Sequence, residues 1–190
     1  MLPVAKIATG FVVAFGALRF NGFDLLFDPV GWALCASGLF QLRRSADDAF
    51  GRAGFFAVAM ACISLVATIW FGASHDQAGS FIAHVIGIAH TAGALIATWL
   101  SVDAVIRQIR PSGDLSRAAV LDVLRWTVAG LGALGALAGY GYADLGPVVL
   151  IAWFAAILAL IVVLYRSASL PCLAPPRGPV ANPLPPGGLD

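Results

Sequence analysis

The sequence has few charged residues, and those that it has are of few kinds. Only 11% of its 190 residues are charged, whereas about 25% of the residues of a soluble domain are charged. Glutamate is absent, and Lys6 is the single lysine. The net charge is +1 and no basic run contains interleaved aromatic residues, so a nucleic-acid-binding role is excluded.

Motifs of soluble enzymes and of metal sites are also missing. The nucleophile elbow G-x-S-x-G, the zinc-protease motif HExxH and the phosphate-binding P-loop do not occur. The three cysteines, Cys35, Cys62 and Cys172, have no CxxC spacing, so neither a local zinc site nor a thiol-redox motif is encoded. We expect cysteines that act as small apolar side chains, no cofactor and no catalytic residue.

Long hydrophobic runs fill most of the chain. Hydrophobic residues make up 60% of the sequence, and the mean hydropathy is +0.90. Because about 20 apolar residues of helix span the hydrocarbon of a bilayer, the runs predict six transmembrane helices. We expect an all-α, polytopic membrane helix bundle over residues 1–170. Its predicted transmembrane helices are 2–20, 24–42, 55–73, 81–100, 124–142 and 147–165.

Basic residues predict the orientation of this bundle, because short loops rich in Lys and Arg remain in the cytoplasm. Of the 11 basic residues, only Arg19 falls on the opposite side from the others when the chain crosses six times. Both termini are therefore predicted to be cytoplasmic. We expect a multi-pass protein of a bacterial cytoplasmic (inner) membrane, in contact with the lipid bilayer.

The cytoplasmic side carries two further predictions. Asp103 and Arg107 have the spacing of a favourable helical ion pair, and Asp114 follows a turn and can cap the next helix. The fourth and fifth helices are therefore expected to form a long hairpin that projects from the bilayer. The proline-rich residues 171–190 are predicted to form a disordered tail.

The second predicted helix has two possible starting points. If it begins at Pro29, Asp28 caps it and proline occupies the favourable first position. That helix is only about 21 Å long up to Leu42. If the helix begins at Asp24, its length of about 28 Å suits a bilayer better. The sequence leaves both versions open.

Small residues predict where helices pack closely. In the longer version of the second helix, Gly31, Cys35 and Gly38 share one face with the two aspartates. Gly135 and Gly139 form a GxxxG pair in the fifth helix. Such a pair packs within the bundle or against another copy, and we favour the bundle.

Polar residues gather on the predicted outer face, where each loop contains a carboxylate. Carboxylates and imidazoles bind hard and borderline cations, although aspartate is also common in turns and caps. Ionisable residues within a span are costly and suggest function, and His84 and His90 are two of them, with His84 closer to the outer face. The candidate residues of this outer site, whose metal is left open, are Asp24, Asp28, His75, Asp76, His84 and Asp144.

The first candidate aspartate opens a recognisable run. The sequence reads Asp24-Leu25-Leu26-Phe27-Asp28 and continues with Gly31, Leu34, Gly38, Leu39 and Leu42. This run resembles a segment of small, uncharacterised bacterial multi-pass membrane proteins, D-L-L-P-D-x-x-G-x-x-L, with Phe27 in place of the proline. The resemblance implies a membrane fold and no particular activity.

Three functions fit these observations. We favour a non-catalytic interaction or assembly partner in the membrane, because of the small-residue faces, the projecting hairpin and the tail. Its partner is a membrane protein or a second copy of the chain. The alternative is a transporter or channel for a cation or small solute, and the third hypothesis is a membrane metalloenzyme that uses the same polar groups.

Overall fold

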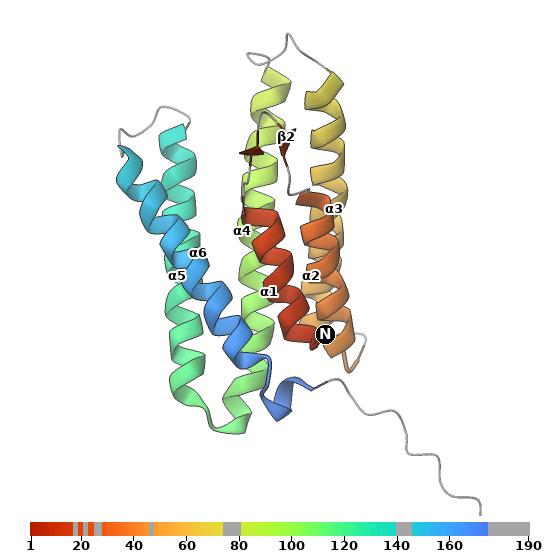
Figure 1. The fold of residues 1–190 in the computed structure, drawn as a ribbon, viewed down its shortest axis with the longest axis vertical. Helices are drawn as coiled ribbons and strands as arrows, with labels where there is room; N and C mark the ends of the chain where they lie inside the picture. Colours follow the sequence, from red (N-terminus) through yellow and green to blue (C-terminus); the bar gives the residue numbers. More distant parts are fainter. Residues whose placement is uncertain are drawn as a thin grey trace, which may run out of the picture.

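The computed structural model describes residues 1–16, 19–20, 23–24, 28–45, 48–73, 81–139 and 146–174. Side chains are described in these ranges except at 19–20, 23–24, 70–73, 81–84, 139 and 146. The described part is a bundle of six α-helices (Figure 1). They are α1 Pro3–Phe15, α2 Asp28–Leu42, α3 Ala49–Ala73, α4 Phe81–Ile109, α5 Leu115–Gly139 and α6 Gly146–Ser167.

Helices that follow one another in sequence pack side by side, and α1 also contacts α6. Figure 1 places the N-terminus, the α4–α5 turn and the end of α6 at the same, lower end of the bundle. The chain therefore runs up and down through the bundle and returns to the end at which it starts.

Four of the helices are long and apolar enough to cross a membrane. The spans are Ala49–Ile69, Val85–Ser112, Leu115–Ala138 and Pro147–Ser167, which belong to α3, α4, α5 and α6. Helix α1 has 13 residues and α2 has 15, or about 20 and 22 Å of helix, so both are shorter than the roughly 30 Å of hydrocarbon. The predicted membrane helix bundle is thus confirmed for four spans, whereas α1 and α2 are shorter than predicted.

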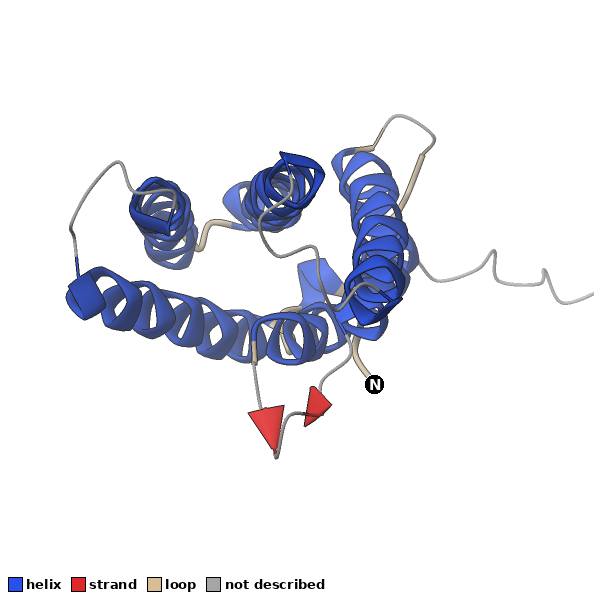
Figure 2. Cartoon of the chain, turned by 90° about the horizontal axis from the view of Figure 1, so that it is seen from above, coloured by secondary structure: helices blue, strands red, loops and turns tan. Residues whose placement is uncertain are grey.

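Helix α2 begins at Asp28, so the shorter of its two predicted versions is right and the start at Asp24 is wrong. Pro29 suits a first turn because its φ is fixed and its missing N–H is not needed there. The Asp28 carboxylate is favoured at the same place by the helix dipole. Asp24 lies instead in strand β2, Phe23–Asp24, which pairs antiparallel with β1, Arg19–Phe20, at the edge of the bundle (Figure 2).

Glycines let α1 and α2 approach closely. A Cβ added at Gly31 would lie 2.6 Å from the backbone nitrogen of Ala14, and one at Gly38 would lie 2.6 Å from the carbonyl oxygen of Pro3. A Cβ added at Gly10 on α1 would likewise lie 2.6 Å from the carbonyl oxygen of Gly31. Close approach of this kind is how helices associate in lipid, and here it joins the two short helices to each other.

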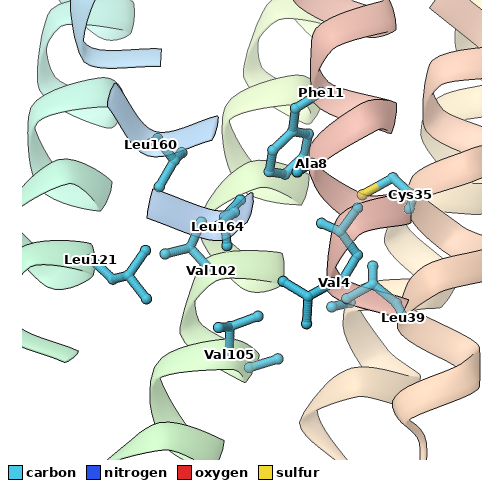
Figure 3. Close-up of a cluster of buried hydrophobic side chains, with 14 of the residues drawn as sticks. Val4, Ala8, Phe11, Cys35, Leu39, Val102, Val105, Leu121, Leu160 and Leu164 are labelled. Atoms are coloured by element: carbon cyan, nitrogen blue, oxygen red, sulfur yellow. The ribbon is translucent and has the colours of Figure 1, made fainter. Parts of the chain in front are cut away.

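The buried core lies in the lower half of the bundle and draws on nearly every helix. Figure 3 shows Val4 of α1 near Leu39 of α2, Phe11 farther up α1, and Val102 of α4 close to Leu164 of α6. All five side chains are at most 1% exposed. Because α1 ends in the middle of the bundle, this shared core is concentrated near the end where the chain begins.

Helices α4 and α5 form the predicted hairpin, and its projection from the bilayer stays a prediction. Helix α4 continues to Ile109, and the 3₁₀ turn Arg110–Ser112 (η1) ends at Gly113, which has a φ of 87°. Asp114 caps α5 by accepting a hydrogen bond from the backbone N–H of Arg117 at 3.1 Å. Arg107 Nε lies 2.6 Å from Asp103 Oδ2, as their spacing predicted.

The predicted disordered tail is wrong for its first residues. Pro171–Leu173 form a 3₁₀ turn, η2, and Leu173 is fully buried. The carbonyl oxygen of Cys172 accepts hydrogen bonds from Arg44 at 3.3 Å and from Gln108 at 3.1 Å. An apolar anchor and two side-chain donors thus hold this turn against the bundle, and residues 175–190 lie outside the described part.

Candidate functional site

One residue of the predicted outer site, Asp28, has a described side chain. Asp24 and His84 are placed by their backbones alone, in β2 and α4. His75, Asp76 and Asp144 lie outside the described residues. The structure therefore leaves the convergence of the six residues untested, and it brings Asp28 together with residues from two other helices.

Asp28, His90 and Ser64 form a polar cluster between α2, α3 and α4. His90 Nε2 lies 3.9 Å from Asp28 Oδ2 and 3.0 Å from Ser64 Oγ. Ser64 is 2% exposed, while the side chains of His90 and Asp28 are 29% and 42% exposed. The cluster thus combines a buried hydroxyl with two ionisable groups that keep part of their surface open.

These three residue types also occur in Ser-His-Asp catalytic triads, but their geometry here is different. In a triad the serine contacts one ring nitrogen of the histidine and the aspartate holds the other. Here Ser64 and Asp28 both approach Nε2 of His90. The described arrangement therefore does not activate Ser64 as a nucleophile, and it fits a binding site better than an acyl-transfer site.

The cluster borders a cavity of about 330 Å³. The surface of this cavity is more apolar than polar, and it is named the polar cavity for the four polar side chains that line it. Its walls include the Asp28 carboxylate, the His90 ring and the hydroxyls of Ser64 and Thr68. Thr68 donates a hydrogen bond to the backbone carbonyl of Ser64 at 2.8 Å, which leaves its oxygen free to accept. A carboxylate with nearby hydroxyl oxygens is a suitable environment for a hard cation.

A second, larger cavity of about 650 Å³ lies on the other side of His90. Its walls come from α1, α2, α4, α5 and α6 and are mainly apolar and aromatic. His90 borders both cavities, so this one side chain is common to the two. Prominent wall residues of the larger cavity are Phe15, Trp32, Leu95, Gly135 and Trp153.

Local sequence explains why Asp28 was predicted and its companions were not. The run Asp28-Pro29 signals a helix start, which fixes the position of the carboxylate. Ser64 lies in an apolar run without any pattern, and its contact with His90 depends on how α3 packs on α4. The signal that pointed to His90 was its place within a span, although His84 was the preferred candidate.

The most extensive network of charges joins α4 and α5 near the lower end of the bundle. Arg125 pairs with Asp103 of α4 and with Asp122 of its own helix. Its guanidinium also lies over the ring of Trp99, 4.1 Å from the ring centroid. The Arg125 side chain is only 11% exposed, so its guanidinium is enclosed by this network, which ties the hairpin together.

Gly135, the first residue of the predicted GxxxG pair of α5, does not pack on a neighbouring helix. A Cβ at Gly135 would meet no atom within 4 Å, because Gly135 borders the larger cavity. Gly139 is the last residue of α5. Gly130, Gly132 and Gly135 also have the G-x-G-x-x-G spacing, but they lie within a continuous helix and not between a strand and a helix, so no dinucleotide-binding turn forms.

No protein-family model, no curated protein and no solved structure matches this chain. Among the described side chains, no group of three or more His, Cys, Asp or Glu residues comes together.

Proposed function

We propose that this protein moves a small cation across the membrane and that Asp28 and His90 bind this cation. The observation that carries the proposal is the ionisable pair that these residues form inside a bundle of membrane-spanning helices, at the wall of a polar cavity. Charged groups among such helices are costly, and they commonly mark ion pathways and proton relays.

The depth of the cluster supports the proposal. Ser64 belongs to the span Ala49–Ile69 and His90 to the span Val85–Ser112. His90 is nine residues from the start of α4 at Phe81, or about 14 Å along the axis. Counted from Val85, where the span starts, the distance is about 8 Å, so the imidazole belongs to the apolar part of α4, where an ionisable group is costly.

The two short helices also support transport. Transporters bind their ions where helices are interrupted at membrane depth, because helix ends and unwound backbone supply the polar groups. Here α1 and α2 both end in the middle of the bundle, well below the upper ends of α3 and α4 (Figure 1). Asp28 stands at the start of one of them, next to the polar cavity.

In this proposal the chain crosses a bacterial inner membrane six times, with α1, α2 and their connecting residues forming the first two crossings. The lower end of the bundle faces the cytoplasm. Arg43, Arg107, Arg110, Arg117 and Arg166 all lie in or beside the connections at that end, as expected for the cytoplasmic side. The polar cavity then opens toward the outer half of the membrane.

The positions of the small residues favour transport over a role as an interaction partner. The glycines of α2 pack on α1 inside the bundle and are therefore not available to a partner protein. Gly135 borders a cavity, which suits a bound molecule. An assembly partner in the membrane would not need an ionisable pair between its helices.

The test is a flux measurement on the purified protein in liposomes. Gradients of H⁺, Na⁺ and K⁺ are imposed in turn and followed with fluorescent indicators sealed inside. At least one gradient should collapse faster than in protein-free liposomes. Asp28→Asn and His90→Gln should each slow that flux at least tenfold, because asparagine still starts a helix well but carries no charge, and glutamine does not titrate.

Asp48→Asn is the matched control. Asp48 also stands at a helix start, where its carboxylate accepts a hydrogen bond from the backbone N–H of Phe50 at 3.3 Å, but it borders neither cavity. This variant should keep the wild-type flux. Equal fluxes in wild-type, Asp28→Asn and protein-free liposomes for all three ions would reject the proposal.

A further inference from the structure

The larger cavity has the walls of a site for a flat or bulky apolar molecule. Phe15 stacks edge-on against Trp32 and against Trp153, with ring centroids 5.8 and 5.7 Å apart. These rings border the cavity on the side of α1, α2 and α6. A volume of about 650 Å³ is in the usual range for ligand pockets, which are mainly apolar with a few polar groups.

Glycines of α5 shape the part of the wall that this helix contributes. No atom lies within 4 Å of a Cβ placed at Gly135, so the absence of a side chain there leaves the cavity open. At Gly132 a Cβ would lie 3.0 Å from Nε1 of Trp153 and 2.5 Å from a methyl group of Leu95. Gly132 therefore lets the indole of Trp153 pack in the wall, while Gly135 provides space for a ligand.

A negative charge lies beside the larger cavity, because Asp28 borders the polar cavity and the two cavities share His90. Trp32 follows Asp28 by four residues on α2, so the two side chains lie on the same face of the helix. His90 borders the larger cavity and lies 3.9 Å from the Asp28 carboxylate. Tryptophan rings attract cations themselves, and Trp153 borders the larger cavity.

We propose that the larger cavity binds a lipophilic organic cation, with its apolar groups against the partly exposed rings of Phe15 and Trp153 and its charge directed past His90 toward Asp28. This inference rests on the cation site proposed above and names a class of substrate for it. The apolar groups gain from leaving water. The charge gains from a carboxylate in surroundings of low dielectric constant, where electrostatic attraction is strong.

A pair of matched probes tests this inference. Tetraphenylphosphonium and tetraphenylborate have nearly the same size and apolar surface but opposite charge. Binding of each is measured by equilibrium dialysis of the purified protein in detergent, with protein-free micelles subtracted. The phosphonium should bind saturably and at least tenfold more tightly than the borate.

Two variants locate the site. Asp28→Asn should weaken phosphonium binding at least tenfold and leave borate binding unchanged, while Asp48→Asn should leave both unchanged. Gly135→Leu, which fills the cavity, should also weaken phosphonium binding, with its fold checked by gel filtration and thermal unfolding. Equal binding of the two probes by the wild type, or full phosphonium binding by Asp28→Asn, would overturn the inference.

The outcome separates this inference from the proposed function. If Asp28-dependent ion flux is found but the phosphonium does not bind, the lipophilic-cation site is rejected and the ion pathway is retained. If the phosphonium binds in an Asp28-dependent way but no ion gradient collapses faster than in protein-free liposomes, the transport proposal is rejected and the binding site is retained.

Discussion

Asp28 and Arg125 show two ways in which this bundle accommodates charge. Arg125 is enclosed by two carboxylates and the ring of Trp99, and its side chain is 11% exposed. Asp28 and Ser64 both lie near Nε2 of His90, and the Asp28 side chain is 42% exposed at a cavity. The first arrangement holds two helices together, whereas the second leaves an ionisable group accessible to a ligand.

Arg125→Gln should destabilise the protein. Removing the guanidinium leaves Asp103 and Asp122 with like charges and without their shared partner. Loss of one member of a largely buried ion pair costs several kcal/mol, and we expect the free energy of unfolding to fall by about 2 kcal/mol because these carboxylates keep some contact with solvent. Unfolding by a denaturing detergent measures this change.

Arg52→Gln is the control for this prediction, because Arg52 is exposed on α3 and changes of exposed residues usually alter stability by at most about 0.5 kcal/mol. If the two variants unfold at the same detergent concentration, the network around Arg125 does not stabilise the hairpin.

Residues whose role depends on their immediate neighbours could be predicted from the sequence. Asp114 as a cap and Asp103 with Arg107 as a pair are local features, and both predictions are confirmed. The contact of His90 with Ser64 joins residues 26 positions apart and depends on the packing of α3 on α4. Nothing in either local sequence indicates it, so the outer site was predicted without two members of the observed cluster.

Helices α1 and α2 show why the lengths of elements were harder to predict than their existence. Hydrophobicity extends over residues 2–20, so the sequence indicates one full span there, yet α1 ends at Phe15. In α2, Pro29 and Asp28 determine where the helix starts, even though a longer helix would fit the bilayer better. The residues that favour a helix start therefore determine where α2 begins more strongly than the thickness of the bilayer does. As a result, α2 starts in the middle of the bundle.

Gly31→Ala should weaken the pairing of α1 and α2. The added Cβ would lie 2.6 Å from the backbone nitrogen of Ala14, and backbone cannot move away as a flexible side chain can. The helices must separate, and overpacking of this kind costs about 1–3 kcal/mol. Thermal unfolding of the purified variant followed by circular dichroism should show a lower midpoint.

Gly130→Ala is the matched control in a membrane-spanning helix. A Cβ at Gly130 would meet no atom within 4 Å, and alanine is favoured over glycine within a helix by about 1 kcal/mol. This variant should unfold at the same temperature as the wild type or higher. A Gly31→Ala protein as stable as Gly130→Ala would show that α1 and α2 do not need their close contact.

For the whole molecule, composition predicted the membrane helix bundle and the hydrophobic runs predicted the order of its helices. Four helices are long and apolar enough to cross a membrane. The spatial relation of the polar and apolar cavities could not be predicted, because their walls come from helices far apart in the sequence. His90 borders both cavities, and the proposed function depends on this arrangement.

In the proposed function, the negative charge of Asp28 binds the cation that crosses the membrane. A variant with Asp28→Cys, Cys62→Ala and Cys172→Ala tests it most directly, since Cys35 is fully buried and can remain. A thiol reagent that attaches a carboxyethyl group is added to the outer side of the liposomes, with a methyl-transferring reagent as the neutral control. Mass spectrometry confirms the labelling.

We expect the Asp28→Cys protein to be inactive in the flux measurement. The carboxyethyl group should restore flux, and the methyl group should not. An Asp28→Cys protein as active as its Asp28 parent, or equal restoration by the charged and neutral groups, would contradict the claim that the charge of Asp28 carries the cation.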